Sequence, residues 1–145
     1  MIAVAPIATA DLAPLRELFL DLSDHETDVA RLAANFSRVA DDPGYILLGA
    51  KLDGQLVGFM MGIICLDFVG SCRPFMVVEN VVVSRAARRQ GVARQLWAAL
   101  EAEARQQDCY YVILVSGDWR EEAHKFYTSV GFAADRFKGF KKYLE

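Results

Sequence analysis

Residues Phe75–Ala104 read FMVVENVVVSRAARRQGVARQLWAALEAEA, and the predicted fold is built around them. The first nine of these residues are mostly β-branched or aromatic, which favours a buried strand. An arginine-rich turn follows, and beyond Gly91 apolar residues recur in four-residue steps, which predicts one face of a helix. These apolar residues are Val92, Leu96, Leu100 and Ala104. The stretch therefore predicts a strand, a turn and a helix, with Gly91 at the helix start.

The turn before this helix has the chemistry of a phosphate-binding site. The first turn of a helix leaves backbone N–H groups unpaired and carries about half a positive charge, so it attracts anions. Gly91 and Ala93 are small enough for a ligand to approach the backbone. Arg88, Arg89 and Arg94 add positive charge that suits a pyrophosphate. The alternative is that these arginines are only the solvated start of a helix.

Residues Arg88–Ala93, RRQGVA, match the signature [Gln/Arg]-x-x-Gly-x-[Gly/Ala] of the GNAT N-acetyltransferases, and the chain resembles that family at this point. Two further segments look like parts of the same family. VVENVVVS, Val77–Ser84, resembles its central strand, and SGDWREEAHKFYTSVGF, Ser116–Phe132, resembles its last strand-to-helix unit. The resemblance covers Ile2–Glu145 and is strongest from Val77 onward. It implies acetyl-CoA as the co-substrate, held through its pyrophosphate at the turn.

Length and composition set the limits for the whole chain. Its 145 residues suit a single domain over residues 1–145, and a hydrophobic fraction of 54% argues against disorder. No apolar run is long enough to span a membrane, and the N-terminus lacks a signal-peptide pattern, so we expect a cytoplasmic protein. The net charge of −3 argues against nucleic-acid binding. Three cysteines and two histidines show no metal-site spacing, and we expect the cysteines to be reduced packing residues.

The predicted fold is α/β (α+β), with one mixed, mostly antiparallel sheet of about seven strands and about four flanking helices. Asp53-Gly54 is the strongest hairpin signal. The helix between the central strand and the next one implies a parallel pair. The resemblance implies that the central strand carries a bulge and that the pair splays around the cofactor. The expected strands are Ile2–Ile7, Tyr45–Leu52, Gln55–Leu66, Phe75–Val83, Cys109–Ser116, Phe132–Arg136 and Gly139–Leu144. The other expected helices are Thr9–Ser23, Asp28–Val39 and Arg120–Val130, the last ended by Gly131.

Two residues are candidates for acid–base chemistry. Glu79 interrupts the apolar strand, and a buried carboxylate there needs a reason because burial is costly. The resemblance implies that Glu79 removes the proton from the acceptor amine; the alternative is a carboxylate that pairs with an arginine or caps backbone N–H groups. The resemblance also implies that Tyr127 protonates the departing thiolate, whereas helical spacing alone favours an ordinary core aromatic.

The resemblance also names the residues that contact acetyl-CoA. Main-chain groups of Val81 and Val83 are expected to bind the thioester and the pantetheine. Many relatives have an asparagine seven residues before the tyrosine, and this chain departs from that pattern with Arg120. The expected cofactor-binding residues are Val81, Val82, Val83, Arg88, Arg89, Gln90, Gly91, Val92, Ala93, Arg94, Ser116, Arg120, Ala123, Phe126 and Tyr127.

The function implied is an acetyl-CoA-dependent N-acetyltransferase acting on a small primary amine, with no metal. Alternatives are a phosphorylated acceptor such as an aminoalkylphosphonate or an amino-sugar phosphate, a protein amine, or a weakly catalytic acyl-CoA-binding module. The presence of both Glu79 and Tyr127 favours catalysis over the last of these. An acidic cluster before the second helix either attracts a cationic amine or is solvated surface; it consists of Asp21, Asp24, Glu26 and Asp28. Many relatives pair as homodimers, so the resemblance leaves a homodimer open.

Overall fold

The computed structural model describes residues 1–145, which form two compact units. The first unit is Met1–Ile113 and the second is Leu114–Glu145. The position of one unit relative to the other is not determined. None of the helices is long and apolar enough to cross a membrane.

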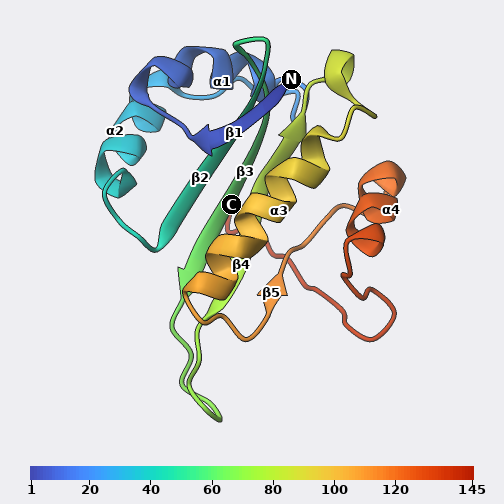
Figure 1. The fold of residues 1–145 in the computed structure, drawn as a ribbon. Helices are drawn as coiled ribbons and strands as arrows, with labels where there is room; N and C mark the ends of the chain where they lie inside the picture. Colours follow the sequence, from blue (N-terminus) through green and yellow to red (C-terminus); the bar gives the residue numbers. More distant parts are fainter. The chain divides into compact units, whose positions relative to one another are not determined.

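The first unit contains one five-stranded sheet in the order β1-β2-β3-β4-β5 (Figure 1). Neighbouring strands are antiparallel except β4 and β5, which are parallel, as the helical crossover between them predicts. The sheet is thus mixed and mostly antiparallel, but it has five strands rather than about seven. The strands are β1 (Ile2–Pro6), β2 (Tyr45–Leu52), β3 (Gln55–Cys65), β4 (Phe75–Val83) and β5 (Val112–Ile113).

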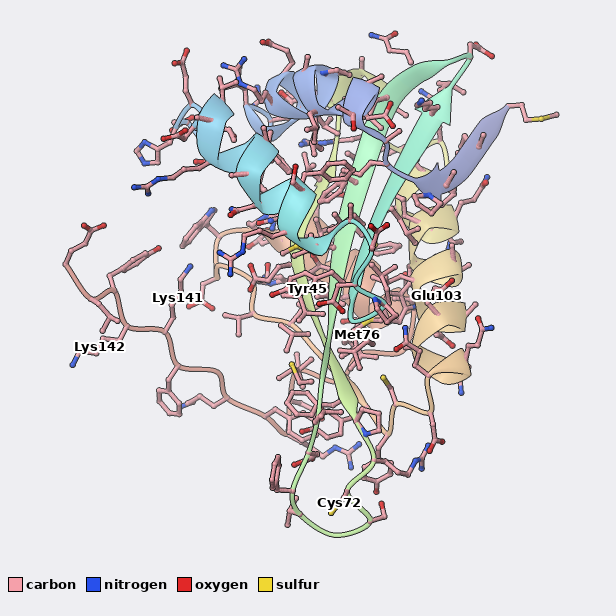
Figure 2. The ribbon with its side chains drawn as sticks, turned by 90° about the vertical axis from the view of Figure 1, so that its left-hand side faces the viewer. Tyr45, Cys72, Met76, Glu103, Lys141 and Lys142 are labelled. Atoms are coloured by element: carbon pink, nitrogen blue, oxygen red, sulfur yellow. The ribbon has the colours of Figure 1, made fainter.

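The β2–β3 hairpin is confirmed, and its turn explains the register. Asp53 and Gly54 both have positive φ values, 51° and 84°, as the two central residues of a tight hairpin turn require. Leu52 consequently pairs with Gln55 directly across the turn. At the opposite end of β3 a loop leads to β4, with Cys72 on it (Figure 2). Cys72 is exposed, which corrects its assignment as a packing residue, while Cys65 and Cys109 are partly buried.

Helices cover both faces of the sheet in the first unit (Figure 2). On one face are α1 (Leu12–Phe19) and α2 (Val29–Val39), and on the other is α3 (Val92–Gln106). Short 3₁₀ helices precede α1 and α3, at Thr9–Asp11 (η1) and Arg85–Ala87 (η2). On the α1 face, Phe19 meets Phe59 of β3 edge to face, with ring centroids 5.6 Å apart.

Two glycines of β3 let α3 pack directly on the sheet. A Cβ atom on Gly58 would lie 2.7 Å from Val92 Cγ1, and one on Gly62 would lie 2.8 Å from Leu100 Cδ1. Because no side chain intervenes, Leu96 and Leu100 are completely buried. Burying a leucine of this kind stabilises the fold by about 2 kcal/mol. The position of the first turn of α3 is therefore set by its contact with the β3 backbone.

The second unit contains one helix, α4 (Glu121–Ser129), followed by Gly131 with a left-handed φ of 107°, as the sequence predicts. The expected strands Phe132–Arg136 and Gly139–Leu144 do not form; Lys141 and Lys142 lie on this irregular segment (Figure 2). A strand needs a hydrogen-bonded neighbour and a face to bury, and in these segments every residue except Phe132 is exposed. The strand expected at Cys109–Ser116 is likewise reduced to Val112–Ile113.

Candidate active site

A β-bulge in β4 places Glu79. Phe59 of β3 pairs with Val82, but Met61 pairs with Glu79, so Asn80 and Val81 lie opposite one residue of β3. Asn80 has a positive φ of 57°, a conformation that asparagine tolerates better than most residues. The extra residue bends the strand and redirects its side chains.

Glu79 is exposed, which corrects the expectation of a buried carboxylate. It pairs across the sheet with Met61, a residue packed against the core on the α1 side, so Glu79 lies on that face. The carboxylate makes no ion pair and accepts no hydrogen bond in the structure. This does not fit the alternative in which Glu79 pairs with an arginine or caps backbone N–H groups. An exposed carboxylate without a partner has lone pairs available to accept a proton.

Beyond the bulge, one edge of β4 has no neighbouring strand. The parallel pairing with β5 consists of Met76 with Val112 and Val77 with Ile113, and it does not continue along β4. Main-chain groups of successive residues point to opposite edges of a strand. Since Ser84 N–H donates to Val57 O at 2.8 Å, toward β3, the groups of Val83 point to the open edge. Val82, by contrast, has its side chain in the core on the α1 face.

The turn between β4 and α3 places Gly91 at the helix start, as the sequence predicts. Gly91 is the residue that precedes the first turn of α3, and its φ of 85° lies in the left-handed region that favours glycine. No side chain caps the N-terminus of this helix. A Cβ atom on Gly91 would have no atom within 4 Å, so the space beside it is open. Arg89 also has a left-handed φ, of 64°.

The arginines near this turn have different partners. Arg85 is held by Asp21, with its Nε 3.8 Å from Asp21 Oδ1. Arg88 Nε donates to the carbonyl oxygen of Val83 at 3.3 Å, and the nearby Gln90 Nε2 donates to Ala86 O at the same distance. Arg89 is exposed and without a partner. The cluster is therefore partly structural, through Arg85 and Arg88.

Among the α3 residues expected to contact the cofactor, Val92 is fully buried by its contact with Gly58. Ala93 is half-buried and Arg94 is exposed. Because the Val92 side chain is buried, a ligand at the first turn of α3 can contact the main chain of this turn but not that side chain.

Tyr127 lies in α4, in the second unit. It is buried, and it packs edge-on against Phe126 and Phe132 with ring centroids 5.7 Å and 5.8 Å away. This aromatic packing is what the core interpretation of Tyr127 predicts, and it leaves the role of the hydroxyl open. Glu79 belongs to the first unit, so the structure does not determine its distance from Tyr127.

The other predicted residues of the second unit flank Tyr127 in sequence. Ser116 Oγ lies 3.2 Å from Nε2 of His124, a histidine that the sequence alone did not connect with it. Arg120 precedes the first turn of α4 and does not cap it with its side chain. Ala123 and Phe126 are half-buried.

The acidic cluster divides into two kinds of residue. Asp28 caps α2, accepting a hydrogen bond from Arg31 N–H at 2.9 Å, and Asp21 holds Arg85. Asp24 and Glu26 are exposed and have no ion-pair partner. Two carboxylates of the four are thus structural, and two remain free to attract a cation. No three His, Cys, Asp or Glu side chains gather in a way that could hold a metal ion.

The Acetyltransferase (GNAT) family model matches residues 11–132. Together with the bulged central strand and the glycine turn, this match shows that the chain belongs to the GNAT family of acetyltransferases. It is an N-acetyltransferase that depends on acetyl-CoA.

Individual relatives agree with this assignment. The chain is 26% identical over 124 residues to an aminoglycoside N(6′)-acetyltransferase type 1 from Serratia marcescens, covering 83% of this chain and 81% of the relative. It is similar to the structure of a putative acetyltransferase from Agrobacterium tumefaciens, with 28% identity, a TM-score of 0.87 and coverage of 98% and 99%. AAC(6′)-Iy in complex with the bisubstrate analogue CoA-S-monomethyl-acetylneamine has a TM-score of 0.80, at 24% identity and 99% coverage of both chains, and shows the fold.

Sequence reasoning missed two residues of this region. No role was assigned to Asn80, although an asparagine within an apolar strand is itself a signal for a left-handed bulge residue. Asp21 was assigned only to the acidic cluster. Its contact with Arg85, 64 residues away in sequence, has no local signal.

Proposed function

We propose that this chain transfers the acetyl group of acetyl-CoA directly to the primary amine of a small molecule, with Glu79 as base and Tyr127 as acid. Acetyl-CoA supplies an activated thioester carbonyl. Glu79 accepts the proton of the acceptor's ammonium group, which has a pKa near 10 in the lysine case and must be neutral to attack. Tyr127 donates its phenolic proton to the thiolate, which is the leaving group.

The observation that carries the proposal is the unpaired Glu79 carboxylate at a bulge beside the open edge of β4. Peptide N–H groups on that edge are fixed donors, and such donors stabilise an oxyanion better than mobile water does. Val81 and Val83 are the residues whose main chain would provide these contacts. Val83 O already accepts a hydrogen bond from Arg88, so its N–H is the group left for a ligand.

The pyrophosphate is assigned to the turn from Arg88 to Ala93. The N-terminus of α3 provides main-chain N–H groups and a partial positive charge, and Gly91 leaves the approach to them open. Arg89, exposed and without a protein partner, is the guanidinium that can form charge-assisted hydrogen bonds to phosphate oxygens.

A polycationic acceptor of the aminoglycoside type is favoured by two observations. The relative from Serratia marcescens is an aminoglycoside N(6′)-acetyltransferase, and the match spans about four fifths of both chains. Asp24 and Glu26 are exposed carboxylates without partners in the segment that precedes α2. Carboxylates of this kind attract cationic ligands and raise their local concentration.

The test is a measurement of free-thiol release from acetyl-CoA with a panel of amines. The panel contains aminoglycosides with and without a 6′-amino group, polyamines, aminoalkylphosphonates, an amino-sugar phosphate and a lysine peptide. We expect release with 6′-amino aminoglycosides and little with the phosphorylated amines. Tight CoA binding without thiol release for any amine would instead identify an acyl-CoA-binding module.

Glu79→Gln tests the proposed base. The variant should keep the affinity for CoA and lose turnover, by about 10²-fold or more at neutral pH. Without a base the reaction relies on amine that is already neutral, so the rate of the variant should rise about tenfold per pH unit below the pKa of the acceptor. A pH–rate profile identical to that of the wild type would place the base elsewhere.

A further inference from the structure

Asp21 connects the segment between α1 and α2 to Arg85, the second residue after β4. Asp21 Oδ2 accepts a hydrogen bond from the backbone N–H of Arg85 at 3.0 Å. Its other oxygen, Oδ1, lies 3.8 Å from Nε of the same residue. One carboxylate therefore holds both the main chain and the side chain of Arg85.

We propose that Asp21 is a positioning residue for the pyrophosphate site, because it fixes the start of the turn that leads to α3. This inference rests on the proposed binding of acetyl-CoA at that turn. On the strand side, Ser84 N–H is bonded to Val57 O, and on the helix side Val92 packs on Gly58. Asp21 supplies a third attachment, from outside the sheet and α3, so the path of η2 between these points is determined.

The contact also separates Arg85 from the other arginines. Its guanidinium lies beside a carboxylate that is partly buried, with 31% of the Asp21 side chain exposed, whereas Arg85 itself is 75% exposed. An exposed ion pair contributes little to stability, so its importance lies in geometry. Arg85 therefore acts in the attachment of the turn and is not a ligand of the phosphates.

Electrostatics alone predicts the opposite effect of removing Asp21. A carboxylate near an anion-binding turn repels a pyrophosphate, and its loss would strengthen CoA binding if charge were all that mattered. A positioning role predicts weaker binding, because the turn must be ordered each time a ligand binds. The sign of the change in affinity therefore distinguishes the two.

The experiment is a calorimetric titration of CoA into the wild type and three variants, Asp21→Ala, Asp21→Asn and Asp41→Ala. Asp41 is the matched control, an exposed aspartate without a partner that follows α2 and has no proposed role in binding. We expect Asp21→Ala to weaken CoA binding by roughly tenfold, as for loss of a charged hydrogen-bond acceptor. Asp21→Asn should restore much of the affinity, because its amide oxygen still accepts from Arg85 N–H. Asp41→Ala should bind CoA as the wild type does.

Amide hydrogen exchange gives a second readout that is independent of ligand. In Asp21→Ala the amide of Arg85 and its neighbours in η2 should exchange faster, while the amides of β3 stay protected. Arg85→Ala should change CoA affinity by no more than about twofold, since its guanidinium is not assigned to the phosphates.

The failure of this inference is distinct from the failure of the proposed function. If the wild type does not bind CoA, the pyrophosphate site itself is wrong and the inference falls with it. If the wild type binds CoA and Asp21→Ala binds equally well or more tightly, the site stands and the positioning role is overturned. A large loss of affinity in Arg85→Ala, with Asp21→Ala unaffected, would make Arg85 a phosphate ligand and also overturn the inference.

Discussion

Glu79 and Asn80 are neighbours at the bulge of β4, where Asn80 has a left-handed φ of 57°. The polarity of Glu79 within an apolar strand was sufficient to single it out as a candidate, whereas Asn80 was not recognised as a bulge residue. Whether Glu79 is buried could not be read from the same pattern, because the bulge exists only in the pairing with β3, where two residues face one. The resemblance to the family predicted a bulge, but the neighbours of Glu79 became known only with the register.

Tyr127 is the second residue whose role depends on a single functional group. Tyr127→Phe keeps the ring and its edge-on contacts with Phe126 and Phe132 and removes only the hydroxyl. If the hydroxyl protonates the thiolate, kcat should fall by about 10²-fold, near the low end for a general acid because a thiolate is already a fair leaving group. Stopped-flow kinetics measure the fall in kcat. The melting temperature, measured by thermal denaturation, and the affinity for CoA should change little. Normal turnover in the variant would assign Tyr127 to packing alone.

Asp11 provides a residue-scale prediction about stability. Its carboxylate is buried, accepts the Ala8 N–H at 2.8 Å and lies 2.9 Å from Lys51 Nζ. The hydrogen bond from Ala8, and next the Lys51 ammonium, hold the pKa of Asp11 below its usual value. A lowered pKa in the folded state contributes stability that is present above the unfolded-state pKa, near 4, and is lost as the pH falls through the folded-state pKa.

Asp11→Asn should therefore lower the free energy of unfolding at pH 7 by about 1–3 kcal/mol, the usual cost of disturbing a buried charged hydrogen bond. The difference between wild type and variant should begin to shrink as the pH falls below about 4, where Asp11 of the unfolded chain becomes protonated while Asp11 of the folded protein is still ionised. Urea denaturation between pH 7 and pH 3 measures both quantities. A difference that stays constant over this range would show that the charge of Asp11 does not stabilise the fold.

At the scale of elements, the hydrophobic pattern predicted α3 and its start because four-residue spacing and Gly91 agree. It did not predict how closely α3 approaches β3, since that distance depends on Gly58 and Gly62, which carry no side chain to enter a pattern. Where the local signal is strong, as at the Asp53-Gly54 hairpin, the predicted ends of the strands agree with the structure to within one or two residues. The expected strands after α4 failed because their apolar residues have no partner strand, a property that no local pattern contains.

Gly58→Val tests the link between β3 and the cofactor turn. A side chain there would lie against Val92, whose Cγ1 is 2.7 Å from the position of the added Cβ, and would push the first turn of α3 away from the sheet. Overpacking of this kind costs about 1–3 kcal/mol. We expect a lower melting temperature and also weaker CoA binding, measured on protein that remains folded. Gly62→Val, which meets Leu100 two turns further along α3, should destabilise the fold similarly but affect CoA binding less.

At the scale of the molecule, sequence and structure agree on a mixed, mostly antiparallel sheet with one parallel pair and four helices. The prediction of one domain over residues 1–145 stays a prediction, because the chain packs as two units whose arrangement is not determined. Catalysis as proposed requires Glu79 of the first unit and Tyr127 of the second to act on one substrate. The pyrophosphate site, by contrast, lies within the first unit.

The assignment of acetyl-CoA to the turn before α3 is tested by a calorimetric titration of CoA into the wild type, Gly91→Glu and Gly70→Glu. Both glycines have left-handed φ values and open space around the position of a Cβ atom, so each variant forces a glutamate into a left-handed conformation and adds one negative charge. Gly70 lies in the loop between β3 and β4, at the opposite end of β4 from the turn. We predict that Gly70→Glu binds CoA as the wild type does and that Gly91→Glu binds it at least about a hundredfold more weakly. Equal affinity in all three proteins would contradict the assignment of acetyl-CoA to the turn before α3.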